Sequence, residues 1–249
     1  MPDNEPTLLA RAALKGARLL YRFAGMEREL ARLVYPNAFH LTQSIYIHIP
    51  KAAGNSVRQI VYGPYSEQLG AHVAARQYRN ASPELFAKYF VFATVRHPLT
   101  RLRSAYHFLS NGGMHDADRR WAAKNLSAFK DFSEFVRAME NKEVRDRIMR
   151  YPHFMPQSWF VCDERGGLIV DFLVRVESFE ADMRQVCRRL QIEYSDKRVN
   201  ETVPRYQDKM TPDGEIERRC HDLYRQDYDV LGYDLSPAAS GEAAGASKA

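Results

Sequence analysis

The sequence predicts an α/β fold in which helices flank a mostly parallel sheet within a single domain. Two apolar runs, residues 44–49 and 89–95, are typical of buried strands. Each run is followed by a break and then by a helical pattern, and strands that alternate with helices favour a parallel sheet. A length of 249 residues and a hydrophobic fraction of 45% are sufficient for one core.

The chain begins with a segment whose spacing predicts an amphipathic helix. Between residues 7 and 23, Arg11, Lys15, Arg18 and Arg22 recur at helical spacing and form one basic stripe. Charges in every turn exclude a secretory signal and a membrane span. Two interpretations stay open: the helix covers the domain, or it lies on an anionic membrane surface.

Two strand-and-helix units follow the N-terminal segment. The first strand, residues 44–49, ends at Pro50, and a turn of small residues leads to a helix over 57–62. A helix that begins at residues 82–84, with proline in its first position, precedes the second strand. The next helix is expected over 99–109. Both strands therefore lead directly into helices.

The second half of the chain is predicted to be mostly helical, with two further strands. Residues 118–150 are charged and mostly helical, and short strands are expected over 159–162 and 168–176. Ser178 is expected to cap a helix over 179–190, because its hydroxyl can accept from exposed first-turn amides.

The last predicted elements are a polar loop, residues 193–210, and a helix from Thr211 to about residue 231. The chain therefore divides into an N-terminal amphipathic helical segment (1–40), the α/β domain (41–235) and a disordered tail (236–249).

Composition favours an anionic ligand and excludes several classes of protein. The formal net charge is +5. Three cysteines are too few for a disulfide scaffold, match no zinc motif and fit a reducing compartment. No apolar run reaches the roughly 18–20 residues that a membrane-spanning helix needs. The basic residues are scattered among acids, so no nucleic-acid partner is expected.

The loop after the first strand has the chemistry of a phosphate cradle. Small residues let backbone amides approach a ligand, the helix N-terminus favours an anion, and a lysine adds a full charge. The residues expected to contact the phosphate are Lys51, Ala53, Gly54, Asn55, Ser56 and Val57. The order differs from the Gly-Lys-Ser/Thr of a Walker A loop. A tight turn with a solvated lysine is the alternative interpretation.

A second candidate phosphate site follows the second strand. Arg96 comes directly after the strand, and Ser104 lies eight residues later. With Pro98 at the helix start, Ser104 lies about two turns in, where its hydroxyl can face a ligand held by Arg96. The alternative is an ion pair for Arg96 and a bond from Ser104 to its own helix. Two anion sites at successive strand ends favour a nucleotide with separated phosphates.

Residues 47–56 (IHIPKAAGNS) resemble the 5′-phosphosulfate loop of sulfotransferases that use 3′-phosphoadenosine 5′-phosphosulfate (PAPS). Residues 94–106 (TVRHPLTRLRSAY) resemble the 3′-phosphate site of the same family. The likeness is to carbohydrate sulfotransferases of the heparan 2-O- and chondroitin type, and it continues more weakly over residues 43–235. It implies a P-loop-like, nucleotide-kinase-like fold. Asn55 stands where members of the family often carry threonine, which leaves the backbone cradle intact.

The resemblance implies transfer of the sulfuryl group from PAPS to a hydroxyl of a carbohydrate acceptor, with 3′,5′-ADP as product and no metal. Lys51 and the loop amides would stabilise charge on the bridging oxygen. Arg96 and Ser104 would hold the 3′-phosphate. His72, in a Gly-Ala-His stretch, is the first candidate for the general base, and Glu84 is the second.

Further basic residues are expected to assist the nucleotide. Arg198 and Arg205 belong to a polar loop that could close over it. Of Arg101 and Arg103, on the same helix as Ser104, one would assist the 3′-phosphate while the other pairs with an acid. Without a secretory anchor, a bacterial-type cytoplasmic enzyme is expected. If the basic stripe lies on a membrane and does not cover the domain, that membrane would be the inner one.

Two other functions stay open. One is a P-loop-like kinase that uses ATP, for which Asp171 is the candidate magnesium ligand. The other is a non-catalytic basic module that binds an anionic glycan or a membrane.

Overall fold

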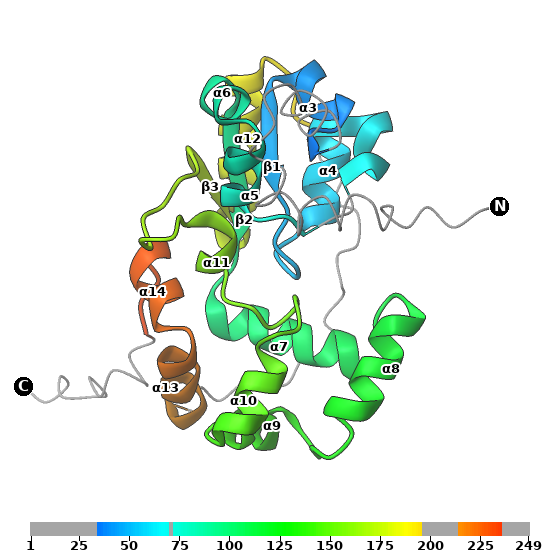
Figure 1. Ribbon diagram of the computed structural model, residues 1–249, viewed down its shortest axis with the longest axis vertical. Helices are drawn as coiled ribbons and strands as arrows, with labels where there is room; N and C mark the ends of the chain where they lie inside the picture. Colours follow the sequence, from blue (N-terminus) through cyan, green and yellow to red (C-terminus); the bar gives the residue numbers. More distant parts are fainter. Residues whose placement is uncertain (1–33, 70–71, 196–213, 236–249) are drawn as a thin grey trace, which may run out of the picture. The chain divides into compact units, whose positions relative to one another are not determined.

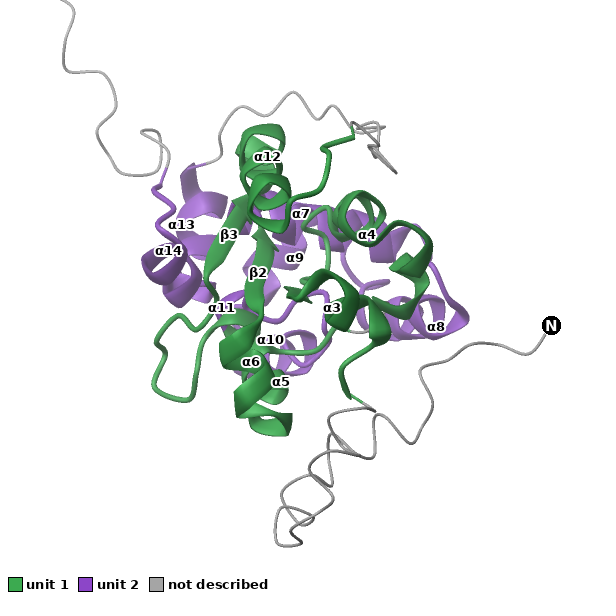
Figure 2. Ribbon diagram, turned by 90° about the horizontal axis from the view of Figure 1, so that it is seen from above, with its two compact units in different colours: residues 1–95, 159–201 green, residues 96–158, 202–249 purple. Residues whose placement is uncertain are grey.

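The computed structural model describes residues 34–69, 72–195 and 214–235. These residues group into two compact units, each built from two segments of the chain (Figure 2). Unit 1 comprises residues 1–95 and 159–201, and unit 2 comprises residues 96–158 and 202–249. The N-terminal stripe over residues 7–23, most of the predicted polar loop and the tail lie outside the described residues.

Unit 1 is built on a three-stranded parallel sheet (Figure 1). Its strands, β1 (Ser44–Ile47), β2 (Phe90–Val95) and β3 (Phe172–Arg175), are adjacent in sequence order. Ile47 pairs with Ala93, and Val95 pairs with Arg175. The predicted parallel sheet is confirmed, and its strands have their carboxyl ends at one edge. In α/β sheets this edge is where ligands usually bind.

Helices accompany the strands of unit 1. They are α3 (Asn37–Thr42), α4 (Gly54–Tyr62), the 3-10 helix η1 (Gly63–Leu69), α5 (Ala75–Ala81), α6 (Pro83–Lys88), the 3-10 helix η2 (Val176–Ser178) and α12 (Phe179–Leu190). The predicted start of α6 is confirmed, since the Ser82 hydroxyl accepts from the Leu85 amide at 3.3 Å. The elements α3, η1 and α5 were not predicted.

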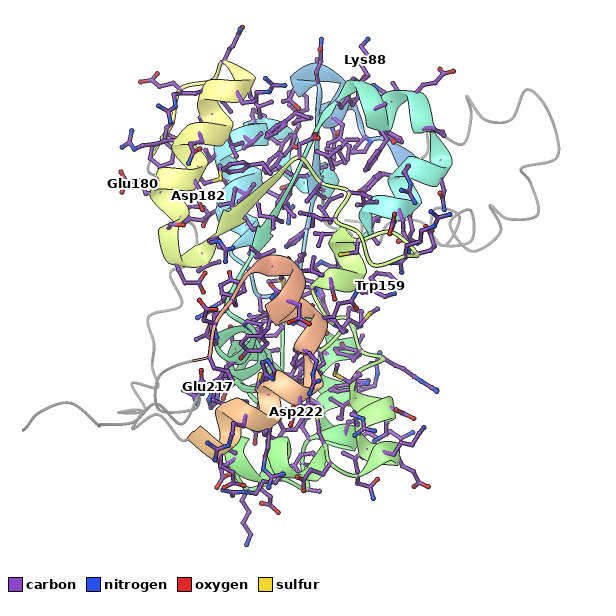
Figure 3. All side chains as sticks on the ribbon, turned by 90° about the vertical axis from the view of Figure 1, so that its left-hand side faces the viewer. Lys88, Trp159, Glu180, Asp182, Glu217 and Asp222 are labelled. Atoms are coloured by element: carbon purple, nitrogen blue, oxygen red, sulfur yellow. The ribbon has the colours of Figure 1, made fainter. Side chains whose placement is uncertain are left out.

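The predicted strand over residues 159–162 is wrong. Ser158–Val161 form a short helix, α11, and Cys162 makes only an isolated antiparallel bridge with Leu168. The Arg76 guanidinium lies 4.3 Å from the centre of the Trp159 ring and donates to the Trp159 carbonyl at 2.7 Å (Figure 3). A run of four apolar residues is compatible with either element, and here the contacts of the Trp159 backbone and ring decide it.

The expected cap at Ser178 is also wrong. One carboxylate oxygen of Asp182 accepts both from the Ser178 hydroxyl at 2.7 Å and from the Arg175 amide at 2.8 Å. Asp182, in the first turn of α12 (Figure 3), therefore organises the connection from β3 into the helix. A carboxylate near a helix N-terminus is also favoured by the helix dipole.

Unit 2 is helical. Its elements are α7 (Pro98–Ser110), α8 (Asp116–Asn125), α9 (Phe132–Ala138), α10 (Lys142–Ile148), α13 (Gly214–Leu223) and α14 (Arg225–Leu231). Leu102, Leu109, Phe135, Phe154 and Cys220 are among the fully buried residues of its core. The helix predicted from Thr211 to about residue 231 is interrupted at Tyr224, and its described part forms the two helices α13 and α14. All three cysteines of the chain are buried, and none forms a disulfide bond.

The turn between α7 and α8 is folded around the carboxylate of Asp118. This carboxylate accepts from the Met114 amide at 3.0 Å and from the Tyr151 hydroxyl. Burial acts to raise the pKa of Asp118, but these hydrogen bonds hold it below its ordinary value. The turn passes through Gly112 and Gly113, with φ of 95° and 65°. Both glycines therefore adopt backbone conformations that side chains disfavour.

Replacing Gly113 should destabilise the protein more than replacing Gly112. A Cβ atom at Gly113 would lie 2.3 Å from Cβ of Asp118, whereas at Gly112 the nearest atom would be 3.9 Å away. Both alanine variants carry a backbone penalty of about 1–2 kcal/mol. Gly113→Ala should cost about 1–3 kcal/mol more, because Asp118 has to move. Urea unfolding of the two variants measures the difference, and equal losses would contradict the close contact.

Candidate active site

The loop between β1 and α4 has an unusual backbone. Lys51 and Ala53 have φ of 67° and 58°, in the left-handed region that residues other than glycine seldom adopt. Each such residue costs about 1–3 kcal/mol and persists only where its surroundings impose it. Turns through left-handed residues direct successive N–H groups toward one side, which makes a concave anion site. The predicted phosphate loop therefore has a backbone that is compatible with an anion site.

The N-terminus of α4 has no side-chain cap, because its N-cap residue is Ala53. The amides of Ser56 and Val57 donate to the Ala53 carbonyl at 3.1 and 3.4 Å. Val57 is fully buried. The backbone amides of Ser56 and Val57, which were predicted to contact the phosphate, therefore already donate to a carbonyl of the chain. The amides of Gly54 and Asn55 come first in the helix, where no carbonyl of the helix can accept from them.

Arg58 is a basic residue of this helix that the sequence analysis missed. Its Nη1 lies 3.4 Å from the Asn55 side-chain oxygen, and its Nε donates to the Ser66 carbonyl at 2.7 Å. Burial lowers the pKa of Arg58. Its position at the start of the helix predicted over 57–62, directly after the phosphate loop, was the available signal.

His48 and His72 form a pair beside this loop. Their ring centres are 4.5 Å apart, and the His48 ring also stacks on Tyr46 at 5.8 Å. A Cβ atom at Gly54 would lie 2.1 Å from Nε2 of His48, so the imidazole occupies the space that glycine leaves. The structure thus brings His72 and the phosphate loop together through His48, which directly follows β1.

The hydrogen bond of His72 determines its tautomer when the ring is neutral. Nδ1 of His72 lies 3.0 Å from the backbone carbonyl oxygen of His48. A carbonyl can only accept, so Nδ1 carries the proton and Nε2 carries the lone pair. A backbone carbonyl that orients an imidazole in this way prepares Nε2 to take a proton from a substrate.

The second predicted site lies at the start of unit 2. Nε of Arg96 donates to the Thr100 hydroxyl at 3.1 Å, and this hydroxyl donates to the His97 carbonyl at 3.0 Å. Ser104 is half-buried on α7, four residues after Thr100, so both hydroxyls lie on one face of the helix. Arg96 and Ser104 are therefore brought to one face. Thr100, which no pattern in the sequence singled out, contacts the Arg96 guanidinium and lies one helical turn before Ser104.

The backbone of Arg96 is held by Gln157, another residue that the sequence analysis missed as a site residue. The Arg96 amide donates to the Gln157 side-chain oxygen at 2.9 Å, and the Gln157 side-chain nitrogen donates to the Arg96 carbonyl at 2.7 Å. The two residues are 61 positions apart, so no local pattern could reveal the contact.

Of Arg101 and Arg103, it is Arg101 that lies near an acid. Arg101 is 1% exposed, donates to the Met155 carbonyl and is attracted by the carboxylate of Asp227. Its positive charge is compensated by the charge of the Asp227 carboxylate. The Arg103 guanidinium lies 5.0 Å from the centre of the Phe132 ring.

Two acidic candidates lie at the other end of the strands. Glu84 is exposed on α6, which leads into the amino end of β2 (Figure 1). Asp171 directly precedes β3, and its carboxylate accepts from the Val91 amide at 2.8 Å. Lys51, in contrast, follows the carboxyl end of β1. The structure therefore does not bring Glu84 or Asp171 to the phosphate loop.

The last two predicted site residues, Arg198 and Arg205, lie outside the described residues. Within the described ranges, no three His, Cys, Asp or Glu side chains gather as a metal site would require. Among the helices of these ranges, none has both the length and the apolar character needed to cross a bilayer.

The close approach of His48 to Gly54 gives a stability prediction. Gly54→Ala should cost about 1–3 kcal/mol, because the imidazole has to leave its place between Tyr46 and His72. In a His48→Ala background the same change should cost less than about 1 kcal/mol, since the methyl group then has room. Urea unfolding of the two single variants and the double variant measures the coupling. Additive losses would show that the ring does not pack on Gly54.

The sequence was compared with models of protein families. The model of the sulfotransferase family matches residues 42–234, which is most of the chain and includes both candidate phosphate-site segments. Searches of curated proteins and of solved structures gave no match. Because the family model covers well over half of the sequence, the chain belongs to the sulfotransferase family.

Proposed function

We propose that this protein transfers the sulfuryl group of PAPS to a hydroxyl group of a carbohydrate, on a P-loop-like sheet. The observation that carries the proposal is the lysine-bearing loop with left-handed backbone, which follows β1 and leads into an uncapped helix N-terminus. A second support is the Arg96, Thr100 and Ser104 face of α7, whose donors suit a second phosphate.

The donor supplies an activated sulfuryl group, and the residues of the chain account for its recognition and for proton transfer. Lys51 and the amides of Gly54 and Asn55 would hold the 5′ end and stabilise the charge that develops on the phosphate oxygen. Arg96 and Ser104 would hold the 3′-phosphate. A lysine and backbone amides can neutralise this charge without a metal ion.

His72 is the proposed general base. Its Nδ1–H group is engaged by the His48 carbonyl, so its Nε2 would remove the proton of the acceptor hydroxyl. The position of Glu84 before the amino end of β2 supports this choice over the carboxylate.

The kinase alternative is weaker for a specific reason. Its proposed magnesium ligand, Asp171, uses its carboxylate to bind the Val91 amide at the amino end of the sheet. A non-catalytic basic module would not require a histidine whose tautomer is fixed beside the phosphate loop.

The first test removes the proposed catalytic groups. Lys51→Met should lower kcat by about 10²–10³-fold, by analogy with removal of a donor to a developing anion. His72→Ala should lower kcat by about 10²–10⁴-fold while 3′,5′-ADP still binds. The readout is transfer of labelled sulfate from PAPS to a panel of glycan acceptors.

Matched controls separate these effects from loss of folding. Lys88→Met changes an exposed lysine of α6 (Figure 3), and His115→Ala changes an exposed histidine before α8. Both control variants should retain full activity. Normal turnover by Lys51→Met and His72→Ala would refute the assignment of the site.

The second test concerns the donor. 3′,5′-ADP should raise the melting temperature of the protein more than ATP with magnesium does, because only 3′,5′-ADP carries a phosphate for Arg96 and Ser104. Preferential stabilisation by ATP would favour the kinase. Stabilisation by neither nucleotide would favour the non-catalytic module.

A further inference from the structure

We propose that Gln157 is a positioning residue that fixes Arg96 for recognition of the 3′-phosphate, and that Asp227 of the C-terminal helix α14 holds Gln157 in place. The inference rests on the proposed function, because it takes the 3′-phosphate as the ligand of Arg96. All of these residues belong to unit 2.

The contact between Gln157 and Arg96 has the form of a two-point clamp. Gln157 is fully buried, and its side-chain amide both accepts from the Arg96 amide at 2.9 Å and donates to the Arg96 carbonyl at 2.7 Å. The side chain thus replaces the neighbouring strand that would satisfy these backbone groups in a sheet. A clamp at both groups restricts rotation of the Arg96 backbone.

Asp227 anchors the segment that carries Gln157. It is fully buried, and its two carboxylate oxygens accept from the amides of Gln157 and Ser158, each at 2.8 Å. Burial raises the pKa of Asp227, while the charge of Arg101 and these amide bonds act in the opposite direction. Two amide donors and a buried cation are the partners that a buried carboxylate needs.

A second contact connects the same turn with the C-terminal segment. The His97 ring lies 5.4 Å from the ring of Tyr228 and 5.4 Å from that of Tyr233, in edge-to-face geometry. Nε2 of His97 also lies 3.4 Å from the Asp234 carbonyl oxygen. The residues on both sides of the Arg96–His97 peptide bond are therefore held by distant parts of the chain.

The clamp has a consequence for ligand binding. With its backbone held by Gln157 and its Nε atom bonded to Thr100, the Arg96 guanidinium is directed along the α7 face that carries Ser104. An arginine ordered before the ligand arrives loses less conformational entropy on binding. Without the clamp, the 3′-phosphate would have to order both the turn and the side chain.

The test compares two nucleotides that differ only in the 3′-phosphate. Isothermal titration calorimetry measures the Kd of 3′,5′-ADP and of 5′-AMP for the full chain and for Gln157→Met, which keeps the length of the side chain but removes both hydrogen bonds. The Kd of 3′,5′-ADP should rise about tenfold or more, and that of 5′-AMP should stay within about twofold. This selective loss supports the positioning role.

Three comparisons sharpen the test. Gln77→Met is a matched control, because Gln77 also binds a backbone amide, that of Ala74 at 2.9 Å, but has no part in the clamp. It should leave both affinities unchanged. Asp227→Asn should reproduce the selective loss at smaller size, whereas Asp229→Asn, on the exposed side of the same helix, should not. Adding Gln157→Met to Arg96→Ala should cause no further loss.

Other outcomes overturn the inference in distinguishable ways. Equal weakening of 3′,5′-ADP and 5′-AMP by Gln157→Met and Asp227→Asn would assign these residues a general structural role. Unchanged affinities in both variants would show that the clamp is irrelevant to binding. If the wild-type protein does not distinguish the two nucleotides, the proposed function is refuted first, and the role of Gln157 with it.

Discussion

The packing of the His48 imidazole against Gly54 is the contact on which the β1–α4 loop depends. The ring occupies the position of a missing Cβ atom, so the loop must pass close beneath it. The chain achieves this approach with left-handed conformations at Lys51 and Ala53. Since Ala53 provides no cap, it is the backbone path that determines where the first-turn amides of α4 lie. The same ring contacts His72, so one residue connects the loop with the proposed base.

The Arg96 turn in unit 2 is built on a related principle. There the backbone is fixed by a buried side chain, Gln157, whose own segment is held by Asp227. In unit 1, Lys51 lies on an irregular segment that is restrained by His48, a residue next to the end of β1. In unit 2, Arg96 lies on an irregular segment that is restrained by Gln157, a residue from a distant part of the chain. Restraint of this kind is what distinguishes a prepared site from a solvated lysine or arginine.

The three strands of the sheet and the helices that follow β1 and β2 could be predicted, because periodicity and the residues that end a strand are local properties of the sequence. Local pattern was insufficient for residues 159–162, where four apolar residues suit a helix as well as a strand. It also failed for Ser178, since the choice between a cap and the Asp182 carboxylate depends on how β3 enters α12. The contact between Gln157 and Arg96 could not be predicted, because the two residues are 61 positions apart.

The extent of the family match is consistent with a functional role for the C-terminal helix. A loop of lysine and backbone amides recognises a phosphate of almost any nucleotide, so it cannot by itself select a donor with a 3′-phosphate. Under the proposed function, that selection depends on the Arg96 turn, which is restrained by Gln157, Asp227 and the aromatic contacts of His97. The matched region ends at residue 234, directly after these contacts. Under the proposed function, helix α14 therefore has two roles: Tyr228 contributes to the helical core, and Asp227 restrains the segment that holds the Arg96 turn.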